Sequence, residues 1–173
     1  NNTIYNLYEV VLKNNDSRLP EREILIFRRF EDGLPETIVP DEVLRYILNS
    51  VLDYAIALTA PGGGIGFSTR SVGSDDKGEK EPPLPQMQRR YIEIVLIFTN
   101  NKQIIEQFSN TSEMQRPQET ELGLNLILRF VREIVQRNRG TMEATLDGKK
   151  GKTSILLRFL AEKREVMYYP PEK

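Results

Sequence analysis

The fold is decided by the stretch from Glu119 to Phe159, which has the sequence ETELGLNLILRFVREIVQRNRGTMEATLDGKKGKTSILLRF. Its first half predicts a helix over 121–138, because apolar residues recur at the i, i+3, i+4, i+7 spacing of one buried face and Gly140 is a good helix stop. The expected buried face consists of Ile127, Phe130, Val131, Ile134 and Val135. In the second half, apolar and polar residues alternate on both sides of a polar turn at 147–152, which predicts a β-hairpin.

The composition limits what the chain can do. Its 173 residues are enough for one domain with a hydrophobic core, and its net charge of −1 gives no indication of nucleic-acid or membrane binding. The apolar runs are too short to span a bilayer. The chain contains no cysteine and no histidine, which excludes disulfides, thiolate or imidazole metal sites, Ser-His catalysis and a phospho-accepting histidine within these residues.

Two further helices and three further strands are expected before this stretch. Apolar spacing predicts helices over 3–15 and 41–59, and Asp41 is a good N-cap for the second. Residues typical of β-strands cover 23–30, 65–70 and 91–98 before this stretch, and 141–146 and 154–159 within it. These elements predict an α+β two-layer sandwich, in which a mixed, mainly antiparallel five-stranded sheet carries three helices on one face.

We expect a single domain over 1–165. The stretch 71–88 is charged and rich in Gly and Pro, which predicts an insert loop between two strands. A solvated hairpin extension is the favoured interpretation of this loop, and a recognition role is the alternative. The residues 166–173 are expected to form a tail.

Several motifs, in order along nearly the whole chain, resemble the ATP-binding domain of sensor histidine kinases, the GHKL or Bergerat fold. The stretch 48–65, LNSVLDYAIALTAPGGGI, is similar to the N-box of that family. Ile104 is in register with the last residue of the D-x-G-x-G-I motif. Leu122-Gly123-Leu124 keeps the L-G-L that precedes the long helix, and Thr153 matches the threonine of the G-x-G-T motif. The resemblance implies a histidine-kinase-like ATPase fold and a cytoplasmic role in two-component signal transduction.

The chain departs from the family at most of the positions that hold ATP. Tyr54 stands where the family has the asparagine that holds magnesium and the triphosphate, and Thr99 replaces the aspartate that pairs with the adenine amino group. The glycines of two motifs are replaced by larger residues. The former ATP-pocket positions are Tyr54, Thr99, Asn101, Gln103, Glu119, Glu121, Gly123 and Thr153.

These departures weaken each part of such a site. Loss of the charge-assisted bond at Thr99 costs about 1–3 kcal/mol. The phenol of Tyr54 would occupy the space of the metal and phosphates. Glu119 and Glu121 would place carboxylates beside the helix start that attracts phosphate elsewhere. Losses at three points amount to several factors of ten in affinity, because about 1.4 kcal/mol is tenfold.

The sequence therefore predicts a degenerate domain, a pseudokinase that acts as a docking or regulatory module without a cofactor, a metal or catalytic residues. The expected partners are other domains of the same protein, a dimer mate or a response-regulator receiver domain. One alternative is an active ATP-dependent protein-histidine kinase domain with an atypical pocket that binds ATP and magnesium. Another is a pocket used for a different small ligand.

The replaced residues also have ordinary structural interpretations. Tyr54 can be a core or pocket-filling aromatic, Glu119 and Glu121 can be first-turn carboxylates of the long helix, and Thr153 can be a plain strand residue. Because an emptied nucleotide pocket would be a costly cavity, we expect the larger side chains to close it. The hydroxyl of Tyr54 is then expected to bond to Thr99 or Asn101.

Overall fold

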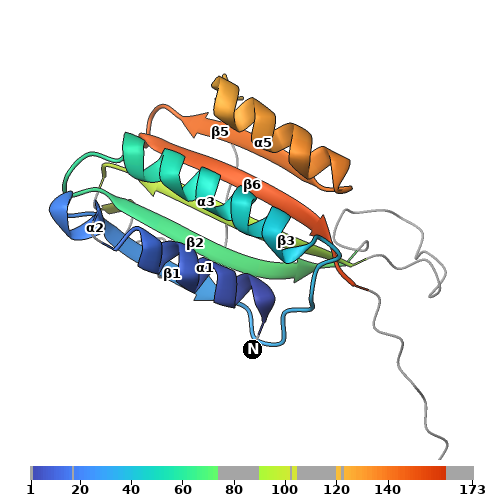
Figure 1. The fold of residues 1–173 in the computed structure, drawn as a ribbon. Helices are drawn as coiled ribbons and strands as arrows, with labels where there is room; N and C mark the ends of the chain where they lie inside the picture. The colour runs from blue at the N-terminus through green and yellow to red at the C-terminus, as the bar shows by residue number, and fades with distance from the viewer. Residues whose placement is uncertain are drawn as a thin grey trace, which may run out of the picture.

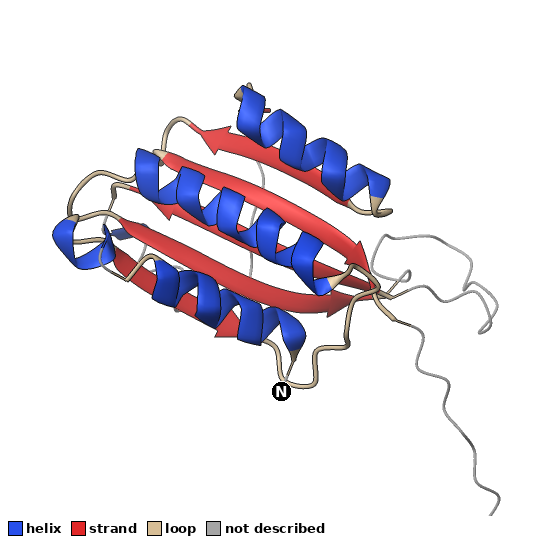
Figure 2. Cartoon of the chain, viewed as in Figure 1, coloured by secondary structure: helices blue, strands red, loops and turns tan. Residues whose placement is uncertain are grey.

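The computed structural model describes residues 2–16, 18–73, 90–101, 103–104, 120–121 and 123–162. In this part of the chain, helices α1, α3 and α5 lie side by side on one face of a single sheet (Figures 1 and 2). The elements are α1 Thr3–Asn14, α2 Arg18–Glu21, β1 Leu25–Phe30, α3 Asp41–Leu58, β2 Gly64–Val72, β3 Tyr91–Thr99, β4 Thr120–Glu121, α5 Leu126–Arg137, β5 Thr141–Asp147 and β6 Lys152–Leu160.

The sheet is mixed and mainly antiparallel, as predicted. Its strand order is β1-β2-β3-β6-β5-β4, and β1 pairs with β2 in parallel while the other pairs are antiparallel. All five predicted strands are present. The short strand β4, which pairs with Thr145 and Leu146 of β5, was not predicted, since two residues are too few to produce an alternating pattern.

The predicted helix 121–138 begins later than the sequence indicated. Thr120 and Glu121 belong to β4, and α5 starts only at Leu126. Asn125 is the N-cap, since its side-chain oxygen accepts a hydrogen bond of 2.8 Å from the backbone N–H of Leu128. Because Asn125 caps the helix at this point, the residues before it are free to pair with β5.

The buried face of α5 differs from the predicted one only in part, since Val131 and Val135 are buried as expected and Ile134 packs against the core. Leu128, Val131 and Val135 are fully buried, whereas Ile127 and Phe130 are 60% and 53% exposed. The helix has two neighbouring apolar stripes, and the spacing rule alone does not tell which one faces the sheet. The structure buries the stripe of Leu128 and leaves much of the other on the surface.

The hydrophobic core lies between the three helices and the sheet. The face of α3 that packs against the sheet contains the residues predicted from its spacing: Leu44, Ile47, Leu48, Val51, Leu52 and Ala55. In β3, alternate residues such as Ile94 and Leu96 point into this core. No helix in the described part of the chain is long and apolar enough to cross a membrane.

The predicted insert begins slightly later than expected. Strand β2 runs to Val72, so its last two residues fall within the predicted loop 71–88. The rest of that loop from residue 74 on, and the predicted tail 166–173, lie outside the described residues.

Candidate functional site

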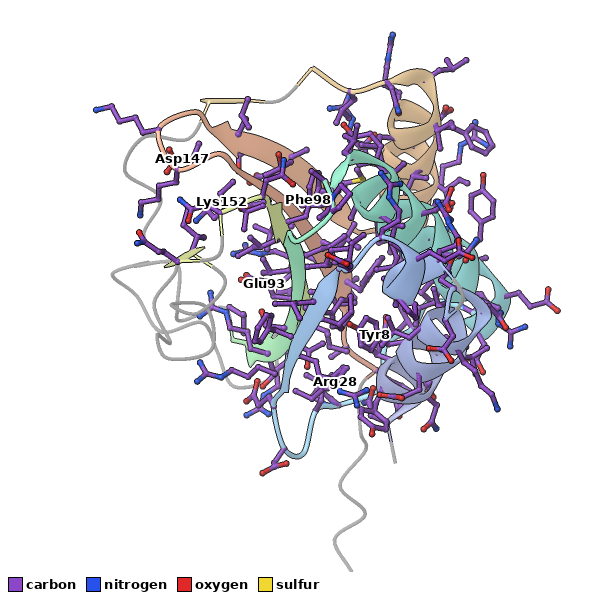
Figure 3. The ribbon with its side chains drawn as sticks, turned by 90° about the vertical axis from the view of Figure 1, so that its left-hand side faces the viewer. Tyr8, Arg28, Glu93, Phe98, Asp147 and Lys152 are labelled. Atoms are coloured by element: carbon purple, nitrogen blue, oxygen red, sulfur yellow. The ribbon has the colours of Figure 1, made fainter. Side chains whose placement is uncertain are left out.

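The predicted pocket positions that the structure describes are spread over several strands, helices and loops. Tyr54 lies in α3, Thr99 ends β3, Gly123 precedes α5 and Thr153 lies at the start of β6. The sheet register brings two of these elements together, because Phe98 pairs with Thr153 and Thr99 pairs with Lys152. Figure 3 shows Phe98 and Lys152 at the same end of the sheet.

Of the two glutamates, the structure places only Glu121, and it differs from the position that the sequence indicated. Glu121 is in strand β4, paired with Thr145, so it is not a first-turn carboxylate of α5. Glu119 lies outside the described residues. The interpretation of both residues as ordinary carboxylates of the first helical turn is therefore wrong for Glu121, because the helix begins five residues later.

Tyr54 is half-buried and packs with its ring against Phe98. The ring centroids are 5.9 Å apart and the planes meet at 78°, which is an edge-to-face contact. Burial raises the pKa of the Tyr54 phenol above its usual 10.0. Among the described residues its hydroxyl forms no hydrogen bond to Thr99 or Asn101, contrary to expectation, and the aromatic contact positions the side chain instead.

Thr99 is buried, with 3% of its surface exposed, and its hydroxyl is used within the protein. The hydroxyl donates a hydrogen bond of 2.9 Å to the carbonyl of Gly151 and accepts one of 3.1 Å from the backbone N–H of Asn101. The side chain of Asn101 in turn accepts a bond of 3.0 Å from the N–H of Gln103. Local hydrogen bonds therefore connect Thr99, Asn101 and Gln103 in successive turns, and of the three only Thr99 is buried.

The loop after α3 is fastened to the same end of β3. The side-chain oxygen of Asn100 accepts a hydrogen bond of 2.7 Å from the N–H of Ala60. A Cβ on Gly63 would lie 2.7 Å from Cγ2 of Thr59 and 2.8 Å from the carbonyl oxygen of Thr99, so only glycine fits there. Sequence reasoning placed Gly63 in the N-box but missed Asn100, whose only signal was its place in the polar run after β3.

The turn between β5 and β6 is organised by Asp147. Its Oδ1 accepts hydrogen bonds of 3.1 Å from the N–H groups of Lys149 and Lys150, and Gly151 has a positive φ of 61°. Lys149 and Lys150 are exposed, as a solvated turn requires, whereas Lys152 is only 9% exposed. Among the described residues, no group of three or more Asp or Glu side chains is placed to hold a metal ion.

Comparison of whole structures gives many similar proteins, and those described here share little sequence identity with this chain. The catalytic domain of the histidine kinase ThkA, in a nucleotide-free form, matches with a TM-score of 0.61 at 9% identity, over 92% of this chain and 95% of that one. The mycobacterial sensor histidine kinase MprB matches with a TM-score of 0.52 at 16% identity, over 90% of this chain and 96% of that one.

A third similar structure is that of full-length ShkA in complex with AMPPNP. Its TM-score is 0.59 at 16% identity, over 91% of this chain but only 30% of that one, so the similar domain of ShkA is part of a larger protein. No protein-family model matches this chain, and no curated protein matches it. With more than nine-tenths of the chain superposed on such domains, the fold is that of the catalytic, GHKL-type ATPase domain of histidine kinases.

Proposed function

We propose that this domain is a degenerate member of the histidine-kinase ATPase fold, a pseudokinase domain that serves as a docking or regulatory module in two-component signal transduction. It works without ATP, magnesium or catalytic residues of its own. Its partners are other domains of the same protein, a dimer mate or a response-regulator receiver domain. We also propose that it acts in the cytoplasm.

The observation that carries the proposal is that the hydroxyl of Thr99 is buried and hydrogen-bonded within the protein. In an ATP site of this fold, the residue at this position must present an acceptor to the adenine amino group. The hydroxyl of Thr99 is buried and bonded to Gly151 and to Asn101, so presenting it to adenine would expose and disrupt that end of the sheet. The Tyr54 ring, which packs against Phe98, would also obstruct a nucleotide on the side of α3.

The test is calorimetric titration of the domain with ATP and magnesium. We expect no binding heat at millimolar nucleotide, and no shift of the thermal unfolding temperature, because a ligand that does not bind the native state does not stabilise it. A dissociation constant in the micromolar range would overturn the proposal.

The alternative is an active ATP-binding kinase domain with an atypical pocket. Two features that match the family's motifs favour it. Gly63 is close-packed, and Thr153 pairs with Phe98 in the sheet. Because the chain has no histidine, the assay for this alternative is phosphate transfer from labelled ATP to a separate helix that carries one. Acid-labile phosphate on that helix would support the active kinase.

A further inference from the structure

Helices α3 and α5 present a continuous apolar surface to solvent, here called the α3–α5 patch. It consists of Leu126, Ile127 and Phe130 of α5 and Tyr46 of α3, which are 81%, 60%, 53% and 44% exposed. The rings of Tyr46 and Phe130 meet edge to face, with centroids 6.4 Å apart and planes at 89°. The patch therefore bridges two helices that lie side by side (Figure 1).

These four side chains are not part of the hydrophobic core or of the residues packed against it. Helix α5 is anchored to the sheet by a different stripe, Leu128, Val131 and Val135, which is fully buried. Leaving large apolar groups in water is unfavourable in proportion to the apolar area that a partner could bury. Contiguous exposed apolar residues on two helices are typical of an interaction surface, whereas single exposed ones are ordinary.

Exposed arginines adjoin patch residues along both helices. Arg45 precedes Tyr46 and Arg129 precedes Phe130, and both are exposed. Among the described residues, neither of them nor Arg132 forms an ion pair with a carboxylate. On α5, Glu133 is paired with Arg137 at 2.9 Å, and Glu42 lies one turn before Tyr46 on α3. On these parts of α3 and α5 the arginines without an ion pair to a described residue, Arg45, Arg129 and Arg132, outnumber the carboxylates without one, Asp41 and Glu42, although the chain as a whole has a net charge of −1.

We propose that the α3–α5 patch binds an amphipathic helix whose apolar stripe is flanked by acidic residues. The inference rests on the proposed docking function and names the chemistry of the partner. Apolar residues at i, i+3, i+4 and i+7 of such a helix contact Leu126, Ile127 and the pair of rings. Its flanking carboxylates face Arg45 and Arg129, which selects against a basic helix and sets the orientation.

The experiment uses two synthetic peptides of equal length and equal apolar stripe. One carries glutamates beside the stripe and the other carries lysines at the same positions, and each has a fluorescent label. Binding to the domain is followed by anisotropy at low and high salt. The variants are Ile127→Ser, Phe130→Ser and Arg129→Glu, and the matched control is Val10→Ser on α1, an exposed apolar residue outside the patch.

We expect the acidic peptide to bind, and the basic peptide to bind at least about tenfold more weakly, because opposite charges across an interface give specificity. Each patch variant should lose about tenfold or more in affinity, as truncated anchor residues do, while Val10→Ser binds like the parent chain. High salt should weaken binding of the acidic peptide. Equal binding of both peptides, binding of neither, or an equal loss in Val10→Ser overturns the proposal.

The calorimetric titration with ATP separates this inference from the proposed function. Nucleotide binding together with selective binding of the acidic peptide would reject the degenerate domain and keep the patch. The absence of both would reject the patch and keep the degenerate domain. Far-ultraviolet circular dichroism of each variant checks that a loss of binding is not a loss of folding.

Discussion

The hydroxyl of Thr99 donates its hydrogen bond to the carbonyl of Gly151, 2.9 Å away and 52 residues further along the chain. This bond joins the end of β3 to the turn that connects β5 and β6. Since the same oxygen also accepts the N–H of Asn101, one small side chain organises both the strand end and the turn after it. The side chain of Thr99 thus helps to hold this end of the sheet together.

Replacing Thr99 with valine tests this structural role. Valine keeps the shape but leaves the carbonyl of Gly151 and the N–H of Asn101 without their partner, which should destabilise the domain by about 1–3 kcal/mol. The measurement is urea unfolding followed by circular dichroism. The control is Thr141→Val at an exposed position of β5, which should change stability by less than about 0.5 kcal/mol. Equal effects of the two substitutions would contradict the role.

Gly63 gives a second prediction, based on space rather than on hydrogen bonds. An alanine there would bring its Cβ within 2.7 Å of Thr59 and 2.8 Å of the Thr99 carbonyl oxygen, so backbone would have to move. We expect Gly63→Ala to cost about 1–3 kcal/mol of stability, the range for overpacking. At Gly123, a Cβ would meet nothing within 4 Å, so Gly123→Ala is the matched control. The thermal unfolding temperatures of both variants test this prediction. A decrease for Gly123→Ala as large as that for Gly63→Ala would contradict it.

Much of the fold could be predicted from the sequence because it depends on long, regular patterns. The spacing of Leu44 to Ala55 gave the buried face of α3, and the β-rich runs gave five strands. The start of α5 was missed because Asn125 caps the helix and Glu121 pairs in β4. The choice between two apolar stripes on α5 is made by tertiary packing, which no local pattern contains.

The candidate site was only partly predictable, for a related reason. The sequence pattern correctly placed Tyr54 within a helix and Thr99 at the end of a strand. It did not give the partners of their side chains. The contact of Tyr54 with Phe98, and the bond of Thr99 to Gly151, depend on which strands become neighbours in the sheet.

A third prediction concerns Glu93, a carboxylate in the middle strand β3 that is 2% exposed. It pairs at 3.1 Å with Arg70 of β2 and at 3.0 Å with Arg158 of β6, so one buried charge lies between two arginines on neighbouring strands. Removing it with Glu93→Ala leaves both arginines without their partner, and we expect a loss of about 3–5 kcal/mol, as for other broken buried pairs. Chemical unfolding gives the value.

The two arginines should not be equivalent. The side chain of Arg158 is 26% exposed and that of Arg70 is 63% exposed, so water screens the Arg70 pair more strongly. We therefore expect Arg158→Ala to be clearly more destabilising than Arg70→Ala. The reverse order would show that exposure does not govern the strength of these pairs.

The last prediction concerns Tyr8 of α1, which is 1% exposed and has no hydrogen-bond partner for its hydroxyl among the described residues. Its ring stacks on Phe67 with centroids 3.9 Å apart and contacts Phe30 edge to face at 5.5 Å. Figure 3 shows Tyr8 between the helices and the sheet, with Arg28 nearby. Burial raises the pKa of the Tyr8 phenol well above its ordinary 10.0, and the charge of Arg28 opposes this only in part.

Two consequences follow for Tyr8→Phe. At neutral pH the substitution removes a buried, unbonded hydroxyl and keeps the ring contacts, so stability should stay equal or rise by about 1 kcal/mol. The exposed Tyr5→Phe is the control and should change stability by less than about 0.5 kcal/mol.

At alkaline pH the parent chain and the variant should diverge. Tyr8 stays protonated in the folded state but loses its proton in the unfolded state above about pH 10. The unfolded state then binds fewer protons, so the free energy of unfolding falls as pH rises above that point. Phenylalanine has no proton to lose, and Tyr8→Phe should lack this part of the fall. Parallel alkaline stability curves for the two proteins would mean that Tyr8 titrates in the folded state as it does in the unfolded one.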